Sequence, residues 1–401
     1  MAADNGAPAA LESAHAGALI DKIEALLRRC AALQGASQRV SAESGLSRTR
    51  LGAALAEAML ARWELEAQAR ELALTGYSAV ARPSARPRRY NRIARRIDSA
   101  LERLGAFGRA AIIARSGLWR TGGQGGLSAM AAYARRGGDA SAQPSALFDQ
   151  AWYLRARPDL VGTRTSPLPH YLLHGAAEDL DPHPLFDTDF YRARNAAALG
   201  ETGLTPLEHF VRVGAGEGRD PHPLFDIAYY LRQAPDLIAS GENPITHYER
   251  EGAARGLSPH RLFAADYYAE QVGQAGAPSL IHYLKSGSDA GLRPHPLFDP
   301  TWYRETYPEL APAEPLVHFL LVGGLEGRSP GPWFDTQRYV ALRVDGLEPG
   351  RNPLVDYLEG GAWRISEPWL GRPEPGFLDL AADYASCALT PLELWARKGR
   401  G

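Results

Sequence analysis

Histidines and aspartates at close spacings are the side chains of this sequence best suited to chemistry. His170 and His174 stand four residues apart, which on a helix places two imidazoles on one face, where they can share a metal ion. Two pairs of carboxylates follow the Asp-x-Asp pattern that holds a metal in some enzymes: Asp179 with Asp181, and Asp187 with Asp189. These spacings are typical of metal binding, which requires that the secondary structure bring the side chains together.

An internal repeat contains all of these residues. Its units begin with Leu-Phe-Asp, and a tyrosine follows each phenylalanine at the fifth position. The phenylalanines are Phe148, Phe186, Phe225, Phe263, Phe298 and Phe334, and the tyrosines are Tyr153, Tyr191, Tyr230, Tyr268, Tyr303 and Tyr339. A histidine with a glycine five residues later marks the second half of five units: His170, His209, His247, His282 and His318. Asp356 takes the place of the sixth histidine, and Thr390-Pro391-Leu392-Glu393 is a partial copy of Thr205-Pro206-Leu207-Glu208.

Each unit encodes two short helices. Asp149 is placed to cap the first helix, and the phenylalanine and tyrosine lie on one apolar stripe. Ser166-Pro167 begins the second, and we expect Gly175 to end it in the left-handed conformation. Such units must stack to bury both stripes. We therefore predict an all-α fold, an α-solenoid of about six to seven two-helix repeats over residues 117–401. The regular offset favours packing of the aromatic stripe over its alternative, a platform for stacking on sugars.

The repeat also gives a structural explanation for the reactive side chains. The equivalents of His174 are Val213, Glu251, Ser286 and Val322, so a histidine pair occurs once. We expect each repeated histidine to make one fixed hydrogen bond. We interpret the histidines of the Pro-His loops as turn residues; they are His183, His222, His260 and His295. One Asp-x-Asp pair follows a helix and the other contains the helix cap. The sequence therefore predicts no catalytic residue, no metal site and no cofactor.

Residues 1–80 are expected to form a separate helical region. Leu19, Ile23, Leu26, Cys30 and Leu33 follow a heptad-like spacing, and a second helix is expected over residues 50–74. These helices predict a helical hairpin or a coiled coil ahead of the repeats. Packing of the two helices on each other within one chain and formation of a homodimer are both open.

Residues 81–116 are expected to form a basic amphipathic linker helix. Thirteen arginines against two acidic residues over residues 82–136 give this stretch a net charge of +11, whereas the whole chain carries −2. The densest group is Arg88, Arg89, Arg92, Arg95 and Arg96. A solvated linker and contact with an anionic membrane surface are both open. Nucleic acid is not an expected partner, because no fold signature for it is present and the repeats are acidic.

Composition places the chain among ordinary globular proteins. It has 401 residues, of which 45% are hydrophobic, and two cysteines, too few for a disulfide framework. The start has no basic segment followed by an apolar stretch, and no run of 18 apolar residues occurs. We expect a cytoplasmic protein, with the inner membrane as a site of peripheral contact.

The repeat resembles one found in bacterial surface-polysaccharide glycosyltransferases. The residues that carry the resemblance are Pro182-His183-Pro184-Leu185-Phe186-Asp187, Pro206-Leu207-Glu208-His209-Phe210 and Glu217-Gly218-Arg219-Asp220-Pro221. In those enzymes the repeat lies beside the catalytic domains. The resemblance therefore implies a non-catalytic scaffold or adaptor of polysaccharide biosynthesis that binds a protein partner, with a glycosyltransferase as one candidate. The alternatives are a glycosyltransferase or part of a split one, and a carbohydrate-binding module. About 116 residues outside the repeats are too few for a Rossmann-type transferase domain.

Overall fold

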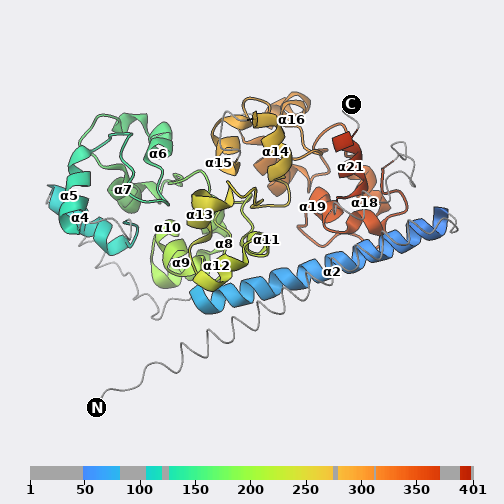
Figure 1. The fold of residues 1–401 in the computed structure, drawn as a ribbon. Coiled ribbons are helices and arrows are strands. Elements are labelled where there is room, and N and C mark those ends of the chain that lie inside the picture. The colour runs from blue at the N-terminus through green and yellow to red at the C-terminus, as the bar shows by residue number, and fades with distance from the viewer. Residues whose placement is uncertain are drawn as a thin grey trace, which may run out of the picture. The chain divides into compact units, whose positions relative to one another are not determined.

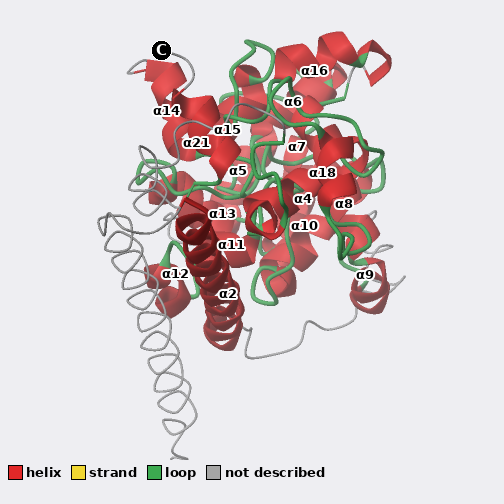
Figure 2. Ribbon diagram, turned by 90° about the vertical axis from the view of Figure 1, so that its right-hand side faces the viewer, coloured by secondary structure: helices red, strands yellow, loops and turns green. Residues whose placement is uncertain are grey.

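Helices make up all the regular structure in the part of the chain that the computed structural model describes. That part consists of residues 48–81, 105–119, 126–273, 279–310, 313–370 and 389–398. Within these ranges no strand is present, and Figure 2 shows red helices joined by green loops. The expected all-α class is confirmed, and the many short helices are compatible with a helical solenoid.

The chain divides into two units. Unit 1 contains Met1–Gly76, Ala228–Pro235 and Ala253–Gly401, and unit 2 contains Tyr77–Ile227 and Asp236–Gly252. The helices labelled in Figure 1 are α2 (Arg48–Ala81), α4 (Gly105–Ser116), α5 (Leu127–Arg136), α6 (Gln150–Ala156), α7 (Pro167–His170), α8 (Thr188–Arg194), α9 (Ala196–Thr202), α10 (Pro206–His209), α11 (Ile227–Leu231), α12 (Pro235–Ser240), α13 (Pro244–His247), α14 (Ala265–Val272), α15 (Leu280–His282), α16 (Pro300–Thr306), α18 (Thr336–Leu342), α19 (Pro353–Leu358) and α21 (Pro391–Lys398). Helix α17 (Pro315–His318) belongs to the same series.

The first helix of a unit starts at an aspartate cap. The carboxylates of Asp149, Asp187 and Asp335 each accept a hydrogen bond from a backbone N–H in the first turn of α6, α8 and α18. Ala264 occupies the same position before α14, with the extended backbone of a cap (φ −85°, ψ 96°) and no side-chain bond. The predicted capping role of the aspartate is therefore confirmed at these helices.

The second helix begins as expected but ends differently. Proline occupies its first turn, and Thr205 and Asn243 cap α10 and α13 through their side chains. The Ser166 hydroxyl makes no such bond and instead donates to the Ala134 carbonyl. Each of these short α-helices passes directly into a five-residue π-helix that ends on the repeated glycine. These π-helices are η2 (Tyr171–Gly175), η3 (Phe210–Gly214), η4 (Tyr248–Gly252), η6 (Tyr283–Gly287) and η8 (Phe319–Gly323).

The expectation that Gly175 is left-handed is wrong. Neither it nor any of its four equivalents has a positive φ. The left-handed residue lies four positions later, where Gly218 has φ 68° and Asp179 has φ 55°. The reason is that the π-helix carries the chain one further turn before it reverses, as the Ala176 N–H bond to the Tyr171 carbonyl (2.9 Å) shows.

The start and the end of a repeat are joined by a backbone bond of constant register. The N–H of Asp149 donates to the Pro182 carbonyl (2.9 Å), and the N–H of Asp187 donates to the Pro221 carbonyl (3.0 Å). The Pro-His-Pro loop itself is a turn closed by the Phe186 N–H on the His183 carbonyl (2.9 Å). The backbone bond therefore closes each repeat at the turn that leads into the next one.

The aromatic stripe forms the core of each repeat. Every phenylalanine and tyrosine of the stripe is at most 1% exposed. Phe148 lies 5.3 Å from Tyr153 between ring centroids and 6.1 Å from Tyr171. Packing is confirmed, and burial excludes these rings from stacking on sugars.

The region before the repeats is described in part. Helix α2 covers the second expected helix, and in unit 1 its Trp63 packs on Gly360 while Arg70 pairs with Glu359. The first helix, near residues 19–33, lies outside the described residues, so the hairpin stays a prediction. Ile112 and Ile113 of α4, counted in the amphipathic linker, are at most 3% exposed and therefore do not form a membrane-facing surface.

The missing cap before α14 gives a test of the repeat frame. Ala264→Asp is expected to raise the free energy of unfolding by about 0.5–2 kcal/mol, because a carboxylate there accepts from N–H groups that lack a partner in the helix. The matched control, Asp335→Ala before α18, is expected to lower it by a similar amount. Urea unfolding followed by circular dichroism measures both, and an unchanged or lower stability of Ala264→Asp contradicts the assignment.

Candidate functional site

A buried pair of tyrosine and histidine recurs at the centre of the repeats. The tyrosine hydroxyl lies within hydrogen-bond distance of the histidine Nδ1 in four units. The pairs are Tyr153–His170 (2.7 Å), Tyr191–His209 (2.8 Å), Tyr268–His282 (2.6 Å) and Tyr303–His318 (2.9 Å). In the sixth unit the Tyr339 hydroxyl donates to Asp356 instead. The partner of the repeated histidine is thus the stripe tyrosine of its own repeat.

The electrostatics of these pairs favour uncharged groups. Burial lowers the pKa of His170, His209 and His318, and a neighbouring arginine lowers it further. Burial also raises the pKa of the paired tyrosines above the ordinary value. At pH 7 both the imidazole and the phenol are therefore neutral, and one hydrogen lies between the hydroxyl oxygen and Nδ1. The pairs therefore join the two helices of a repeat and offer no general base of raised basicity.

The repeated glycine is required by the tyrosine hydroxyl. A Cβ on Gly214 would overlap the hydroxyl of Tyr191 and lie 3.1 Å from its Cζ. The same overlap occurs at Gly175, Gly287, Gly323 and Gly361 with the tyrosine of each repeat. Tyrosine, histidine and glycine therefore form one packing arrangement. The tyrosine hydroxyl bonds to the histidine and leaves room for no side chain larger than that of glycine.

Gly214→Ala tests this arrangement. The variant is expected to lose about 1–3 kcal/mol of unfolding free energy, because the added methyl group forces the Tyr191 ring away from His209. Removal of the hydroxyl in the double variant Tyr191→Phe/Gly214→Ala is expected to recover part of that loss. A double-mutant cycle in urea measures the coupling. Strictly additive losses contradict a direct contact.

The histidines of the Pro-His loops are turn residues, as the sequence indicates. Their Nδ1 atoms accept the N–H two residues later, at 3.0 Å from Leu185 to His183 and 3.2 Å from Leu297 to His295. The remaining ring nitrogen reaches a carboxylate in some repeats, such as Glu249 for His183 (2.9 Å).

The two Asp-x-Asp pairs are explained by helix α8. Asp187 is its cap, and Asp181 accepts the Thr188 N–H at 2.8 Å. Asp220 and Ser258 make the same bond to Ile227 and Ala265, so a carboxylate is not essential at this position. Burial raises the pKa of Asp181 to about 7, which does not favour a charged metal ligand.

A cavity of about 700 Å³ lies in unit 2, and we call it the α4–α10 groove. Apolar walls come from Ile112, Leu172, Leu173 and Leu199, and polar atoms come from Arg115, Arg192 and Glu208. The lining contains neither a nucleophile with its base nor a set of metal ligands. The arrangement can bind a largely apolar chain segment, and the sequence analysis missed it because its walls come from separate elements.

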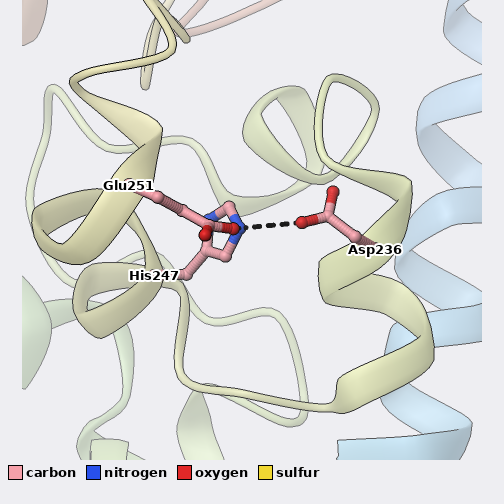
Figure 3. A group of neighbouring side chains, drawn as sticks. All are labelled: Asp236, His247 and Glu251. Atoms are coloured by element: carbon pink, nitrogen blue, oxygen red, sulfur yellow. Dashed lines mark hydrogen bonds and ion pairs between the residues drawn. The ribbon is translucent and has the colours of Figure 1, made fainter.

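A second polar cluster gathers around His247 in unit 2 (Figure 3). His247 Nε2 lies 2.8 Å from Glu251 Oε1 and 3.2 Å from Asp236 Oδ2. Glu251 is the equivalent of His174 in the repeat frame, but its proximity to Asp236 was not predicted from the sequence. The spacing of His247 and Glu251, one helical turn, was the available signal.

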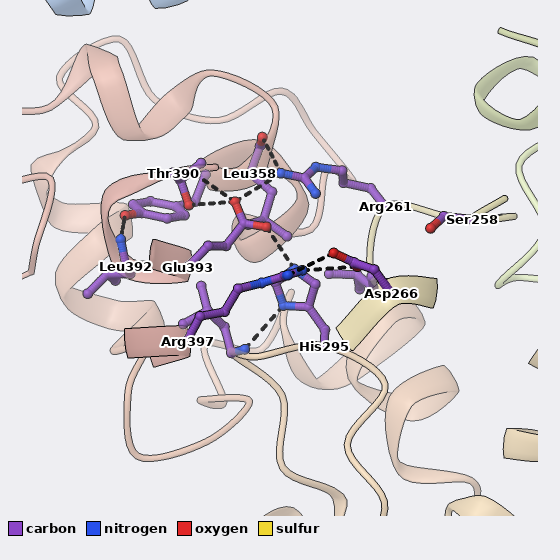
Figure 4. Close-up of polar contacts among 12 residues, drawn as sticks. Ser258, Arg261, Asp266, His295, Leu358, Thr390, Leu392, Glu393 and Arg397 are labelled. Atoms are coloured by element: carbon purple, nitrogen blue, oxygen red, sulfur yellow. Dashed lines mark hydrogen bonds and ion pairs between the residues drawn. The ribbon is translucent and has the colours of Figure 1, made fainter. Parts of the chain in front are cut away.

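A third cluster, in unit 1, fixes the C-terminal helix α21 (Figure 4). Glu393 is almost fully buried and meets Arg261 (3.0 Å) and His295 Nε2 (3.1 Å). Arg397 of the same helix binds Asp266 at 2.7 Å. Because His295 Nδ1 accepts a backbone N–H, Nε2 carries the ring proton and donates it to Glu393. Glu393 and His295 are closed to solvent, whereas Asp266 is exposed, and the buried pair suits the cluster to holding structure.

Two copies of Thr-Pro-Leu-Glu have opposite electrostatics. Both Glu208 and Glu393 accept the N–H and hydroxyl of the threonine three residues earlier. Burial raises the pKa of Glu208. Burial acts in the same direction on Glu393, but Arg261 and His295 outweigh it and hold its pKa well below the usual range. One sequence pattern thus gives a carboxyl that resists charge and one that is held charged.

Isosteric amides distinguish the two carboxyls. Glu393→Gln is expected to lower the free energy of unfolding at pH 7 by about 3–5 kcal/mol, because it leaves the buried Arg261 without its counter-charge. Glu208→Gln, the matched control, is expected to cost less than about 1 kcal/mol. Since the folded pKa of Glu393 is depressed, its contribution is present above the unfolded pKa of about 4.3 and is lost as pH falls below it. Equal losses at pH 7 in thermal and urea unfolding contradict this account.

The densest group of arginines in the basic segment lies outside the described residues. Arg88, Arg89, Arg92, Arg95 and Arg96 therefore remain sequence-based candidates for contact with an anionic surface. No helix in the described ranges combines the length and hydropathy that a membrane span requires.

Comparison of the chain with known protein families, curated proteins and solved structures finds no match. The fold and the side-chain geometry are therefore the basis for the function proposed below.

Proposed function

We propose that this protein is a non-catalytic helical-repeat scaffold of bacterial surface-polysaccharide biosynthesis, which binds a partner protein. The observation that carries the non-catalytic part is the repeated use of the same reactive residues for packing. Tyrosine and histidine pair with each other in four units at 2.6–2.9 Å. An active site concentrates unusual residues at one place, whereas here ordinary ones recur. The polysaccharide context rests on the resemblance of the repeat.

The α4–α10 groove supports the binding part of the proposal. Leu172, Leu173 and Leu199 are only half-buried there, and the volume of about 700 Å³ is in the range of binding pockets. Arg115 adds positive charge beside the apolar wall, whereas Arg192 is paired with Asp179. We propose as occupant a short segment of the partner protein that presents apolar side chains with an acidic residue at their edge.

Two alternatives have less support. A transferase needs a pocket that holds a diphosphate, and the residues of the Asp-x-Asp pairs serve α8 instead. A carbohydrate-binding module needs a row of uncovered aromatic rings. The stripe rings are buried, and arginines lie over two of the outer rings, Arg194 over Phe190 (4.5 Å) and Arg155 over Trp152 (5.6 Å).

We further propose that the scaffold acts at the inner membrane through its basic segment. The net charge of +11 over residues 82–136 supports electrostatic attraction to anionic lipid. Because Ile112 and Ile113 are buried in unit 2, this contact depends on charge more than on insertion of α4.

The scaffold proposal is tested by separating turnover from binding. Purified protein is expected to release no nucleotide from common sugar nucleotides, with or without Mg²⁺ or Mn²⁺. Crosslinking in cells of the native source is expected to capture a defined partner, and Leu173→Glu in the groove is expected to abolish binding of that purified partner. Val344→Glu is the control, because Val344 is 95% exposed and far from the groove residues in sequence.

Two results contradict the proposal. Sugar-nucleotide turnover that disappears in Asp187→Asn or Asp189→Asn, with the fold intact, supports the transferase alternative. Partner binding that is equal in Leu173→Glu and Val344→Glu rejects the groove as the docking surface.

A further inference from the structure

The first helix of five repeats carries a second aromatic side chain outside the buried stripe. It stands one position before the stripe tyrosine, and we call it the outer aromatic residue. The five are Trp152, Phe190, Tyr229, Tyr267 and Trp302. Tyr229 and Tyr267 are at most 7% exposed, whereas the other three are only half-buried. Two of the outer aromatic residues are therefore covered, and three remain accessible.

Helix α2 covers Tyr229 in unit 1. The guanidinium of Arg70 lies 5.1 Å from the centroid of the Tyr229 ring. Glu66 pairs with Arg232, whose own guanidinium lies 5.0 Å from the same centroid. Glu66 and Arg70 are four residues apart, so one face of α2 presents both side chains. A glutamate and an arginine one turn apart thus dock α2 on a ring and an arginine of the repeat.

Helix α21 covers Tyr267 in unit 1 with the same pair of side chains. The guanidinium of Arg397 lies 5.6 Å from the centroid of the Tyr267 ring, and Glu393 pairs with Arg261 at 3.0 Å. Arg397 also binds Asp266, the residue before the covered ring, at 2.7 Å (Figure 4). Glu393 and Arg397 are again four residues apart. Two helices far apart in the sequence therefore use a Glu-x-x-x-Arg pair to dock on an outer aromatic residue.

Phe190, on α8 in unit 2, combines the features of the two covered positions. An aspartate precedes Phe190, as it precedes Tyr267, and an arginine follows about one turn later, as it follows Tyr229. These residues are Asp189 and Arg194, and both are exposed. The guanidinium of Arg194 lies 4.5 Å from the centroid of the Phe190 ring. We call Asp189, Phe190 and Arg194 the Phe190 surface; it offers the ring and both charges that a helix engages in unit 1.

We propose that the Phe190 surface docks a helix of a partner protein that carries a glutamate and an arginine one turn apart. The glutamate pairs with Arg194, and the arginine lies over the Phe190 ring beside Asp189. Helices α2 and α21 of a second copy are engaged within their own unit, which favours a different protein as the source.

This inference rests on the proposed role as a protein-binding scaffold, and it concerns a surface other than the α4–α10 groove. Arg192 lines the groove and is two residues from Phe190, so the two side chains lie on opposite sides of α8. Docking at the Phe190 surface therefore leaves the groove open to its own occupant.

The test uses a defined helical peptide as the probe. A labelled peptide with the sequence of residues 60–74, which contains Glu66 and Arg70, is held helical by a side-chain bridge and titrated with the full-length protein in fluorescence anisotropy. Phe190→Ala and Arg194→Glu are each expected to weaken binding about fivefold or more. A peptide with Glu66→Arg is expected to recover binding to the Arg194→Glu protein, because the charges are then exchanged.

Trp302→Ala is the matched control. Trp302 is a half-buried outer aromatic residue, but Glu305 follows it in place of an arginine, so peptide affinity is expected to stay unchanged. Leu173→Glu in the groove is also expected to leave it unchanged. Peptide binding at the Phe190 surface supports this inference even where no partner depends on Leu173, so the two proposals can fail separately.

Four results overturn the inference. They are no binding of the peptide to the unchanged protein, equal binding to Phe190→Ala, loss of binding in Leu173→Glu, and loss of binding in Trp302→Ala. A dimer of the unchanged protein that Phe190→Ala dissociates overturns the choice of occupant, because a second copy then fills the surface.

Discussion

The contact of a tyrosine hydroxyl with a histidine ring and a glycine backbone sets the geometry of four of the repeats. The hydroxyl comes from the first helix, and both the imidazole and the glycine come from the second, at either end of a π-helical turn. A larger residue in place of Gly214 would displace Tyr191, and a displaced Tyr191 would leave His209 without its buried partner. The spacing of the two helices is therefore fixed by hydrogen bonding and by volume at the same time.

This constraint leaves other positions of the repeat free to vary. Polar groups vary around the constant histidine. They are Arg157 with Asp159 and Glu178 in one repeat, Arg328 with Glu309 and Glu326 in another, and Asp236 with Glu251 in a third. In the sixth unit even the histidine is exchanged for Asp356, which still accepts the tyrosine hydroxyl and gains Arg351 as a counter-charge (3.0 Å). New chemistry can thus arise beside a core that stays the same, and the polar cluster at His247 is an example.

Much of the local structure could be predicted from the sequence. The helix class, the aspartate caps, the prolines of the first turn and the burial of the aromatic stripe all follow from spacing within about 40 residues, because they depend on nearby parts of the chain. The interpretation of the Pro-His loops as turns holds for the same reason, since His183 bonds to a backbone group two residues away. The role of Gly175 was assigned to the wrong cause, because steric contact with Tyr153 leaves the same sequence signal as a left-handed cap.

The tertiary structure distinguishes residues that stand in the same sequence pattern. Glu208 and Glu393 stand in the same four-residue pattern, yet one is buried with a raised pKa and the other is held charged by Arg261, 132 residues earlier in the chain, and by His295. The α4–α10 groove and the meeting of Asp236 with Glu251 likewise depend on which elements come together. The sequence by itself determined the repeat and its helices, because local spacing specifies them. The charge states of the buried carboxyls and the geometry of the polar clusters were decided by folding. Both depend on the low dielectric constant of the protein interior and on groups that distant segments bring within a few ångströms.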